Sequence, residues 1–271
     1  MEKAVQENLA LWNEWTHIHE KSKMYNIEGF LAGENRLHSI ELDELGAQVP
    51  GRSMLHLQCH FGLDSLSWAR LGAQVTGADF SGEAIRLAKA LNEKAGLSAR
   101  FVCSELDKLP GVLEGQFDIV YTSYGVLTWL PDLTRWAQVI DHFLKPGGTF
   151  YMVEFHPYFM TLDDADNAQG VKIGYTYFHT KEPLESEVVG SYADRTAEVQ
   201  QKVCYEWSYG VGDVLNNLLG VGLQLEYFHE FPYSVDGLLK SMVKDDQGYY
   251  RLKGLEEWIP LMFSLKANKP R

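Results

Sequence analysis

The chain has 271 residues, 45% of them hydrophobic, and it carries a formal net charge of −13. This length allows one large domain or two small ones with a sizeable core, and the ordinary apolar content argues against disorder. No apolar run approaches the roughly 18 residues that a membrane helix needs. So acidic a surface repels phosphate backbones, and because no Lys/Arg run is present, nucleic acid is not an expected partner.

The predicted elements begin with an N-terminal helical cap, residues 1–50, which is rich in aromatic side chains such as Trp12 and Trp15. It closes at Gly46, a residue typical of helix ends. From Pro50 onwards, short apolar strands alternate with amphipathic helices. The first five expected strands are "MLHL" from Met54, "AQVTGADF" through Asp79, "ARFVCSEL", "FDIVYTSY" and "TFYMVEF".

Helices are expected between these strands. One contains Leu63, Leu66 and Trp68. The next is capped by the Ser81 hydroxyl and stops at Gly96, and a third covers "LTRWAQVIDHFL". Long crossovers between short strands predict a parallel sheet with helices on both faces.

Residues 157–206 interrupt this alternation with Tyr, Asp and Glu in place of long apolar runs. We interpret them as an inserted lid over a site. The core would then be residues 51–156, and residues 207–271 would complete the sheet of one overall domain. That last part contains a helix, "GVGDVLNNLLGVG", and the strands "LQLEYFHEF" and "IPLMFSLKANK".

Ligands of open parallel sheets bind beyond the carboxyl ends of the strands. The first strand ends in a turn with a single glycine, and the second ends at an acid that can accept both hydroxyls of a ribose. The groups at the five strand ends are Gln58–Gly62, Asp79, Ser104–Glu105–Leu106, Ser123–Tyr124 and Glu154–Phe155–His156.

These strand ends resemble the motifs of the class I S-adenosylmethionine-dependent methyltransferases. The motifs are "LHLQCHFG", "VTGADFS", "FVCSELDKLP", "FDIVYTSYGVLTWLPDL" and "LKPGGTFYMVE", in the family's order and at its spacing over residues 50–156. The first motif departs from the family pattern. His56 stands where an acid is usual, and Gln58 and His60 replace two of three glycines. A bacterial subset of the family carries a first motif of this kind.

The resemblance implies a Rossmann-like methyltransferase fold, with a doubly wound, mostly parallel seven-stranded sheet whose last strand is antiparallel. It implies S-adenosylmethionine as cofactor, S-adenosylhomocysteine as product, and in-line methyl transfer to a small molecule. Asp79 would bind the ribose, Phe80 would lie beside the adenine, and Glu105 near its amino group. The full set of cofactor-binding residues implied is Gln58, His60, Gly62, Asp79, Phe80, Ser104, Glu105, Leu106, Ser123 and Tyr124.

Several residues allow two interpretations. His56, Cys59 and His60 are metal-ligand types, but strand alternation separates their side chains, so no metal is expected and His56 is interpreted as a core histidine. His156, and less so Glu154, are candidate bases on the substrate side, with a structural role as the alternative.

Two interpretations are also possible for several aromatic residues and for the pair Glu206–Trp207. Tyr124 and Trp129 belong to the pocket or to the core. Glu206–Trp207 closes the pocket or staples the following helix. Four further aromatic residues line a pocket or pack a small satellite core: Tyr175, Tyr177, His179 and Tyr192.

Two other functions compete with methyl transfer. The altered first motif allows a catalytically inactive adenosylmethionine-binding protein, and the fold class allows a dinucleotide-dependent oxidoreductase, although the glycine-poor turn disfavours it. Three widely spaced cysteines and an acidic N-terminus without a secretion-signal pattern favour a cytoplasmic location. The acceptor, its methylated atom and the oligomeric state are not predicted.

Overall fold

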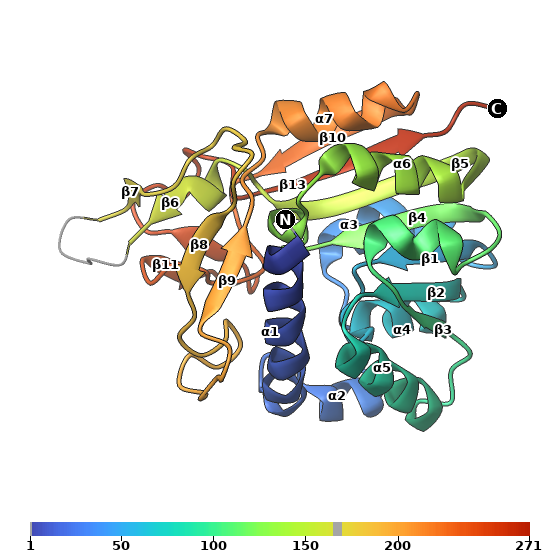
Figure 1. The fold of residues 1–271 in the computed structure, drawn as a ribbon, viewed down its shortest axis with the longest axis horizontal. Coiled ribbons are helices and arrows are strands. Elements are labelled where there is room, and N and C mark those ends of the chain that lie inside the picture. The colour runs from blue at the N-terminus through green and yellow to red at the C-terminus, as the bar shows by residue number, and fades with distance from the viewer. Residues whose placement is uncertain (1, 165–169) are drawn as a thin grey trace.

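A twisted seven-stranded sheet forms the centre of the computed structural model, which describes residues 2–164 and 170–271 (Figure 1). The strand order is β10-β13-β5-β4-β1-β2-β3. All neighbours pair in parallel except β13, which runs antiparallel to both β5 and β10. In chain order the strands are β1 (Ser53–Leu57), β2 (Gln74–Asp79), β3 (Arg100–Cys103), β4 (Phe117–Ser123), β5 (Leu144–Phe155), β10 (Gln224–Phe231) and β13 (Met262–Asn268).

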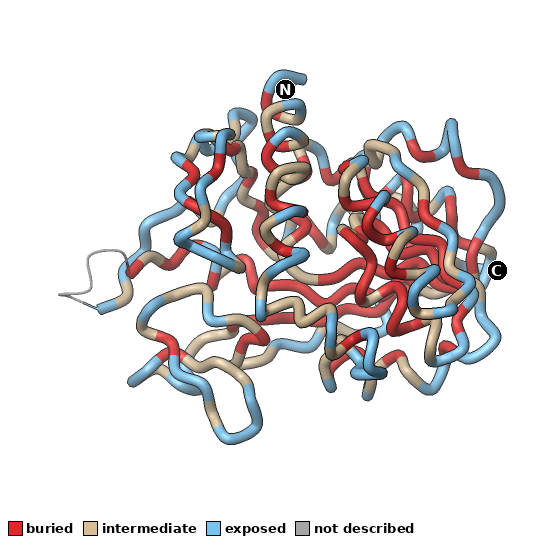
Figure 2. Tube along the Cα trace, turned by 90° about the horizontal axis from the view of Figure 1, so that it is seen from below, coloured by how far each residue is buried: buried red, intermediate tan, exposed pale blue. Residues whose placement is uncertain are grey.

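Helices cover both faces of this sheet because its strands are apolar on both sides. On β1, Leu55 and Leu57 face the cluster that includes the buried sides of α6 and α7, whereas Met54 faces the other side. Figure 2 shows the central strands as continuously buried stretches of the chain, and β1, β4 and β5 are buried along most of their length, whereas the edge strand β10 is not. The covering helices are α4 (Leu63–Arg70), α5 (Gly82–Lys94), α6 (Leu133–Phe143) and α7 (Val211–Gly220).

The predicted fold class is confirmed, including the antiparallel last strand. The Ser81 hydroxyl caps α5 by accepting from the Ala84 N–H, as expected from the sequence. One boundary differs. β5 already begins at Leu144, so the "KPGG" turn lies within its bounds. The pairing of β4 with β5 shifts register there, and Gly147 has a φ of 77°.

The N-terminal region consists of α1 (Glu2–Lys21), α2 (Ile27–Leu31) and α3 (Ser39–Leu45), followed by a short 3₁₀ turn, η1 (Gly46–Gln48). Helix α1 stands between the sheet and the strands β8 and β9 (Figure 1). On the core side, Asn13 accepts a hydrogen bond from the Ser81 hydroxyl at 2.7 Å. On the other side, the Asn8 side chain donates to the carbonyl of Tyr205 and accepts from its N–H, at 2.7 and 2.9 Å.

The inserted segment 157–206 forms small antiparallel pairs, and its residues 165–169 lie outside the described part. A second excursion between β10 and β13 contains a third small pair. The pairs are β6 (Leu162–Asp163) with β7 (Lys172–Ile173), β8 (Leu184–Glu187) with β9 (Val203–Glu206), and β11 (Met242–Lys244) with β12 (Tyr250–Leu252). The remaining 3₁₀ helices are η2 (Leu106–Gly111), η3 (Leu127–Trp129) and η4 (Phe159–Thr161).

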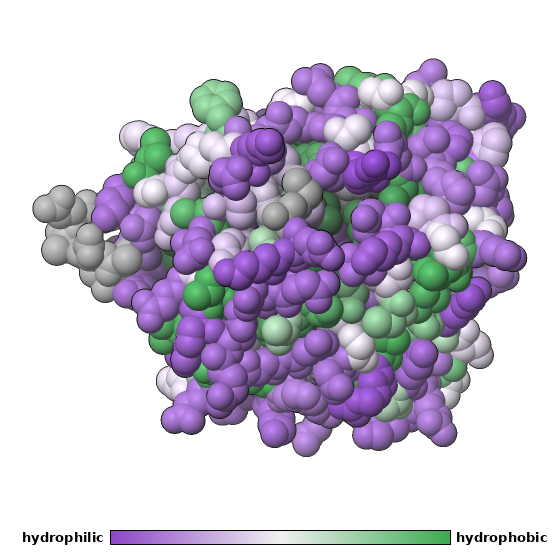
Figure 3. All heavy atoms as spheres, in the orientation of Figure 1, coloured by the Kyte–Doolittle hydropathy of each residue, from purple (hydrophilic) through white to green (hydrophobic). Residues whose placement is uncertain are grey.

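Hydrophilic residues dominate the face seen in Figure 3, and apolar residues are scattered among them. Within the described residues, no helix combines the length and the apolar character needed to cross a membrane.

Gly62 makes the fold testable at the turn between β1 and α4. Its φ is 76°, and a Cβ there would lie 2.6 Å from Cε1 of the Phe101 ring. We expect Gly62→Ala to lower the free energy of unfolding by about 2 kcal/mol or more, from left-handed strain and overpacking together. Urea unfolding followed by circular dichroism measures it.

Gly82→Ala is the matched control. Gly82 begins α5, and a Cβ there meets no atom within 4 Å. Alanine also has the higher helix propensity, so this variant should be as stable as the parent or slightly more stable. Equal stability of both alanine variants would contradict the packing of the turn described above.

Candidate functional site

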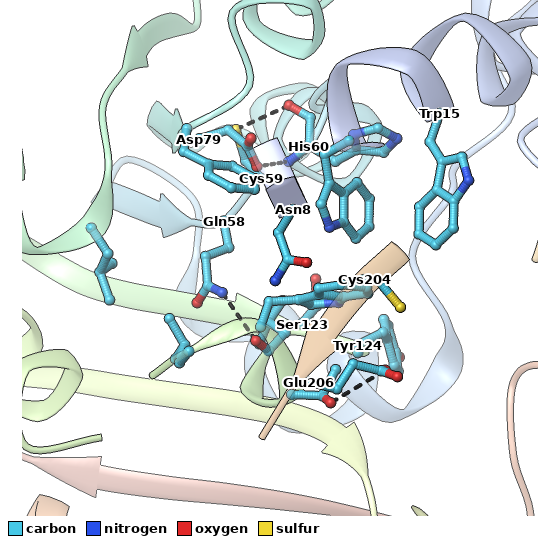
Figure 4. A pocket seen from close by; sticks show the side chains of 18 of the residues that line it. Asn8, Trp15, Gln58, Cys59, His60, Asp79, Ser123, Tyr124, Cys204 and Glu206 are labelled. Carbon is cyan, nitrogen blue, oxygen red and sulfur yellow. Dashed lines mark hydrogen bonds between the residues drawn. The ribbon is translucent and has the colours of Figure 1, made fainter. Parts of the chain in front are cut away.

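A cavity of about 1100 Å³ lies beyond the carboxyl ends of β1 to β4. Residues of α1, η3 and the β8–β9 pair also line it. All ten predicted cofactor-binding residues border this one cavity: Gln58, His60, Gly62, Asp79, Phe80, Ser104, Glu105, Leu106, Ser123 and Tyr124. Figure 4 shows side chains from several of these elements facing a common space.

The turn after β1 has an unusual backbone. Gln58, His60 and Gly62 have φ values of 56°, 49° and 76°, so every second residue is left-handed. These are the three positions at which we expect the first motif of the resembled family to carry glycine. A non-glycine residue in this region costs about 1–3 kcal/mol and persists where its surroundings hold it. The turn thus keeps the shape of a glycine-rich turn while gaining two polar side chains.

Asp79 is one of the groups that hold this turn. Its Oδ2 accepts from the His60 N–H and its Oδ1 from the Ser81 N–H, each at 2.8 Å. Burial raises the pKa of the carboxyl to about 6, and the backbone hydrogen bonds oppose that rise. An ionised carboxylate offers about four acceptor positions. Two of the acceptor positions of Asp79 therefore remain for a ligand in the cavity.

The His60 side chain joins the turn to α1 and to the insertion. Its Nε2 lies 2.9 Å from His19 Nδ1, and His19 Nε2 lies 2.7 Å from the Ser191 hydroxyl. Burial lowers the pKa of His19 to about 3. Burial and the nearby His19 lower the pKa of His60 well below its usual value. Both rings are therefore neutral at physiological pH, and one of them donates its single ring proton in the hydrogen bond that joins them.

Gln58 has hydrogen-bonding capacity to spare. Its amide nitrogen donates to the carbonyl of Val126 at 3.1 Å, which ties the first turn to the loop after β4. Its amide oxygen is buried and has no hydrogen-bond partner among the described residues. An unmatched buried acceptor beside a cavity fits a ligand that carries an N–H donor, such as an ammonium group.

The loop after β4 is held from two sides. Tyr124 is left-handed, with a φ of 33°, and its hydroxyl donates to the buried Glu41 of α3 at 2.5 Å. The Ser123 hydroxyl donates to Asp64 at 3.2 Å. Burial raises the pKa of Asp64 to about 6 and that of Glu41 to about 8. Asp64 lines the cavity and adds to its polar side, whereas Glu41 does not border it and acts through Tyr124.

Indole rings form an aromatic wall of the cavity. The Trp12 ring meets those of Trp15 and Trp129 edge to face, with centroids 5.3 Å apart in both pairs. Tyr192 lies 5.6 Å from Trp15 and 4.5 Å from the His19 ring. All four aromatic residues line the cavity, so Trp129 belongs to the pocket as well as to an apolar cluster.

The structure places the two candidate bases elsewhere. His156 does not border the cavity. Its Nδ1 accepts from the Tyr158 N–H at 3.0 Å, and its Nε2 lies 3.1 Å from Glu230 of β10. Glu154 accepts from the N–H groups of Gly125, of Val126 at 2.8 Å and of Leu127 at 3.3 Å. The geometry therefore gives both residues structural roles, and their proposed action as bases has no support in it.

The residues for which the sequence left two interpretations open also divide into those that line the cavity and those that do not. Tyr175, Tyr192 and Glu206 line the cavity, whereas Trp207 is buried in the main core beside α6 and α7. Tyr177 borders only a smaller cavity, and His179 stacks on Tyr209. His56 is a buried histidine between the Ser65 and Ser123 hydroxyls. The described residues contain no cluster of three or more His, Cys, Asp and Glu side chains arranged for a metal ion.

Sequence reasoning missed several residues of the site. Asn8 and the indoles of α1 line the cavity, as do Asp64 and Asp236, whose carboxyl pKa values are raised to about 6 by burial. The spacing of Trp12, Trp15 and His19 at intervals of three and four residues was the available signal, because it places three rings on one helix face. No local pattern marks Asp236, which comes from the second excursion.

Comparison with known proteins agrees with this geometry. Residues 55–152 match the methyltransferase domain family. A ubiquinone biosynthesis O-methyltransferase of Xanthomonas campestris is 32% identical over 43% of this chain and 49% of its own length. An uncharacterized methyltransferase of Synechocystis is 35% identical over 46% of this chain and 57% of its own. The chain thus spans about half the length of the curated relatives it matches.

A solved structure extends the likeness beyond the matched region. An S-adenosylmethionine-dependent methyltransferase from Mesorhizobium loti superposes with a TM-score of 0.58 at 24% identity, and the match covers 88% of this chain and 99% of that one. Identity at this level supports the common fold.

The buried Glu41 gives a testable pH dependence. Folding raises its pKa from 4.5 to about 8, so the native state binds more protons than the unfolded chain between these values. Its contribution to stability is complete below pH 4.5 and is lost as the pH rises through 8. Glu41→Gln keeps a hydrogen-bonding group of the same shape beside Tyr124 but cannot ionise. Between pH 4.5 and 8 the free energy of unfolding should therefore fall less in the variant than in the parent, by up to a few kcal/mol.

Urea unfolding at closely spaced pH values from 4 to 9 measures the difference. Glu28→Gln, at an exposed position of α2, controls for the removal of one acid. Parallel stability curves for the parent and Glu41→Gln would show that the Glu41 carboxyl is ionised normally in the folded protein.

Proposed function

We propose that this chain, which belongs to the class I S-adenosylmethionine-dependent methyltransferases through residues 55–152, transfers the methyl group of S-adenosylmethionine to a small molecule. One observation carries the proposal. The predicted cofactor residues, scattered from Gln58 to Tyr124, border a single cavity that also has an aromatic wall. A nucleotide-like cofactor and a small acceptor can share such a space.

The residues present fit this cofactor. Asp79 retains acceptor positions for the two ribose hydroxyls, and Phe80 and Leu106 line the cavity at the ends of β2 and β3, where the adenine would bind. Glu105 borders the same end and is paired with Lys108 at 2.7 Å. The unpartnered Gln58 oxygen provides an acceptor for the methionine ammonium group.

The chemistry asks little of the protein beyond positioning. S-adenosylmethionine supplies an electrophilic methyl group on a sulfonium, which is already a good leaving group. The chain's residues therefore align the acceptor in line with that methyl group and keep water out. Helix α1 and the β8–β9 pair contribute to both tasks because they line the cavity on the side away from the sheet.

The inserted segment thus acts as part of a cover that includes α1. The two are joined by the paired hydrogen bonds of Asn8 with Tyr205, and by the Trp15 indole N–H, which donates to the Gly190 carbonyl at 2.9 Å. We divide the chain accordingly into a cap (1–50), a cofactor-binding core (51–156), an inserted lid (157–206) and the end of the sheet (207–271). A cytoplasmic location is proposed on the free cysteines Cys59, Cys103 and Cys204.

Two other functions are distinguished by direct measurement. A dinucleotide-dependent oxidoreductase would bind NAD, so calorimetric titration with NAD and with S-adenosylmethionine separates it from the other two. An inactive adenosylmethionine-binding protein would bind the cofactor without turnover against a panel of small acceptors. The neutral His60 and the strained Gln58 in the first turn are the observations that keep this last function under consideration.

Asp79→Ala tests the cofactor site. Each hydrogen bond from a ribose hydroxyl to the carboxylate contributes roughly 1.5–3 kcal/mol. Loss of both should raise the dissociation constant of S-adenosylmethionine by at least about 100-fold. Isothermal titration of the parent and the variant measures this change.

Glu114→Ala removes an exposed acid away from the cavity and should leave the affinity unchanged. Because Asp79 also accepts the His60 and Ser81 N–H groups, the fold of the variant is checked by its urea transition. A folded Asp79→Ala protein with parental affinity would remove Asp79 from the cofactor site.

A further inference from the structure

Glu206 lies at the end of β9 and borders the cavity. Side chains alternate between the faces of a strand, so Glu206 shares a face with Cys204, and both line the cavity. Opposite Cys204 in the β8–β9 pair is Ser186, which lines it as well. Figure 4 shows Cys204 and Glu206 on the same strand, on the side of the cavity away from Gln58 and Asp79.

The Glu206 carboxylate is held by few interactions within the protein. Among the described residues its one hydrogen bond comes from the Thr128 hydroxyl at 3.4 Å, and no basic side chain lies within ion-pair distance of it. The residue is half-buried, and burial raises the pKa of its carboxyl. Glu206 also borders a second cavity of about 260 Å³, so space is present on two sides of it. Most of its acceptor capacity is therefore open to a ligand.

Flat aromatic side chains line the same cavity as this carboxylate. Trp129 follows Thr128, and its ring lies 5.3 Å from that of Trp12 and 6.0 Å from that of Trp15. Cys204 packs in the same apolar cluster. The Trp12 indole N–H is buried without a partner among the described residues. Ring faces and edges of this kind favour a planar, largely apolar ligand.

The charge of the cavity lining restricts the class of ligand further. Among the described residues that line the cavity, acidic side chains outnumber Lys and Arg nine to three. The acids are Glu2, Asp64, Asp79, Glu105, Asp107, Asp132, Glu187, Glu206 and Asp236, and the bases are Arg36, Lys108 and Arg135. Lys108 is already paired with Glu105. Such a lining attracts cations and repels carboxylates and phosphates.

We propose that Glu206 binds the protic group of the methyl acceptor, and that the acceptor is an uncharged or cationic aromatic compound with an O–H or N–H group. This inference rests on the proposed methyl transfer. In the reaction, the acceptor oxygen or nitrogen forms a bond to the methyl carbon while the carbon–sulfur bond breaks and its electron pair stays on sulfur. The acceptor's proton passes to the Glu206 carboxylate, which acts as the base.

Saturation-transfer NMR on the full chain saturated with S-adenosylhomocysteine tests the acceptor class. Three single-ring probes differ mainly in charge: catechol is neutral, benzylamine cationic and benzoate anionic. Catechol and benzylamine should bind at least about tenfold more tightly than benzoate. Equal binding of benzoate, or no saturation transfer to catechol and benzylamine, would overturn the inference.

Glu206→Gln tests the residue. The amide has the same shape but neither the charge nor the ability to take a proton, so benzoate should gain at least about tenfold in affinity. With S-adenosylmethionine and an aromatic compound that the parent protein methylates, kcat of the variant should fall by about 100-fold or more. The acid limb of the pH–rate profile should be lost as well. Glu185→Gln, an exposed acid of the paired strand β8 that does not border the cavity, is the matched control and should behave as the parent.

The affinity for S-adenosylhomocysteine distinguishes a failure of the proposed methyl transfer from a failure of the inference about Glu206. Both glutamine variants should bind it as tightly as the parent, which also shows that they are folded. A parent protein that does not bind it would contradict the proposed function and the inference together. Normal binding, with Glu206→Gln indistinguishable from Glu185→Gln in probe affinity and in kcat, would contradict the inference alone.

Discussion

The site depends on the way His60 is held. Its backbone N–H donates to Asp79, which fixes the left-handed turn after β1 against the end of β2. Its side chain meets His19 of α1, and His19 meets Ser191 of the insertion. One residue thus joins the core, the N-terminal helix and the inserted segment. A glycine at this position would relieve the backbone strain but would remove the side chain that links the turn to its cover.

The consequence is a cavity with two unlike sides. The sheet side presents strand ends with Asp79, Gln58 and Glu105, whereas the cover presents indole rings and Glu206. The cover is assembled from parts of the chain nearly two hundred residues apart, joined by Asn8 at the edge of β9. In the function we propose, cofactor recognition and acceptor recognition fall to different segments, so the acceptor side could change without disturbing the core.

The sequence predicted the core well because its signals are local. Apolar strands, the Ser81 cap and the stop at Gly96 each act over a few residues, and the strand-end rule then places Asp79 at the site. The cover was harder to predict, because its contacts join residues far apart in the chain. His156 shows the limit: it follows a strand that ends near the cavity, but its side chain turns towards Glu230 of β10. Only the three-dimensional structure shows on which side of the sheet such a group lies.

Hydrogen exchange followed by mass spectrometry, with and without S-adenosylhomocysteine, tests the central claim that the core and its cover enclose one ligand site. Peptides from 57–64 and 79–82 should exchange more slowly when the ligand is bound, and so should peptides from α1 and from 184–206, because His60, His19 and Ser191 are joined. Protection confined to the core, with α1 and 184–206 unchanged, would contradict the account.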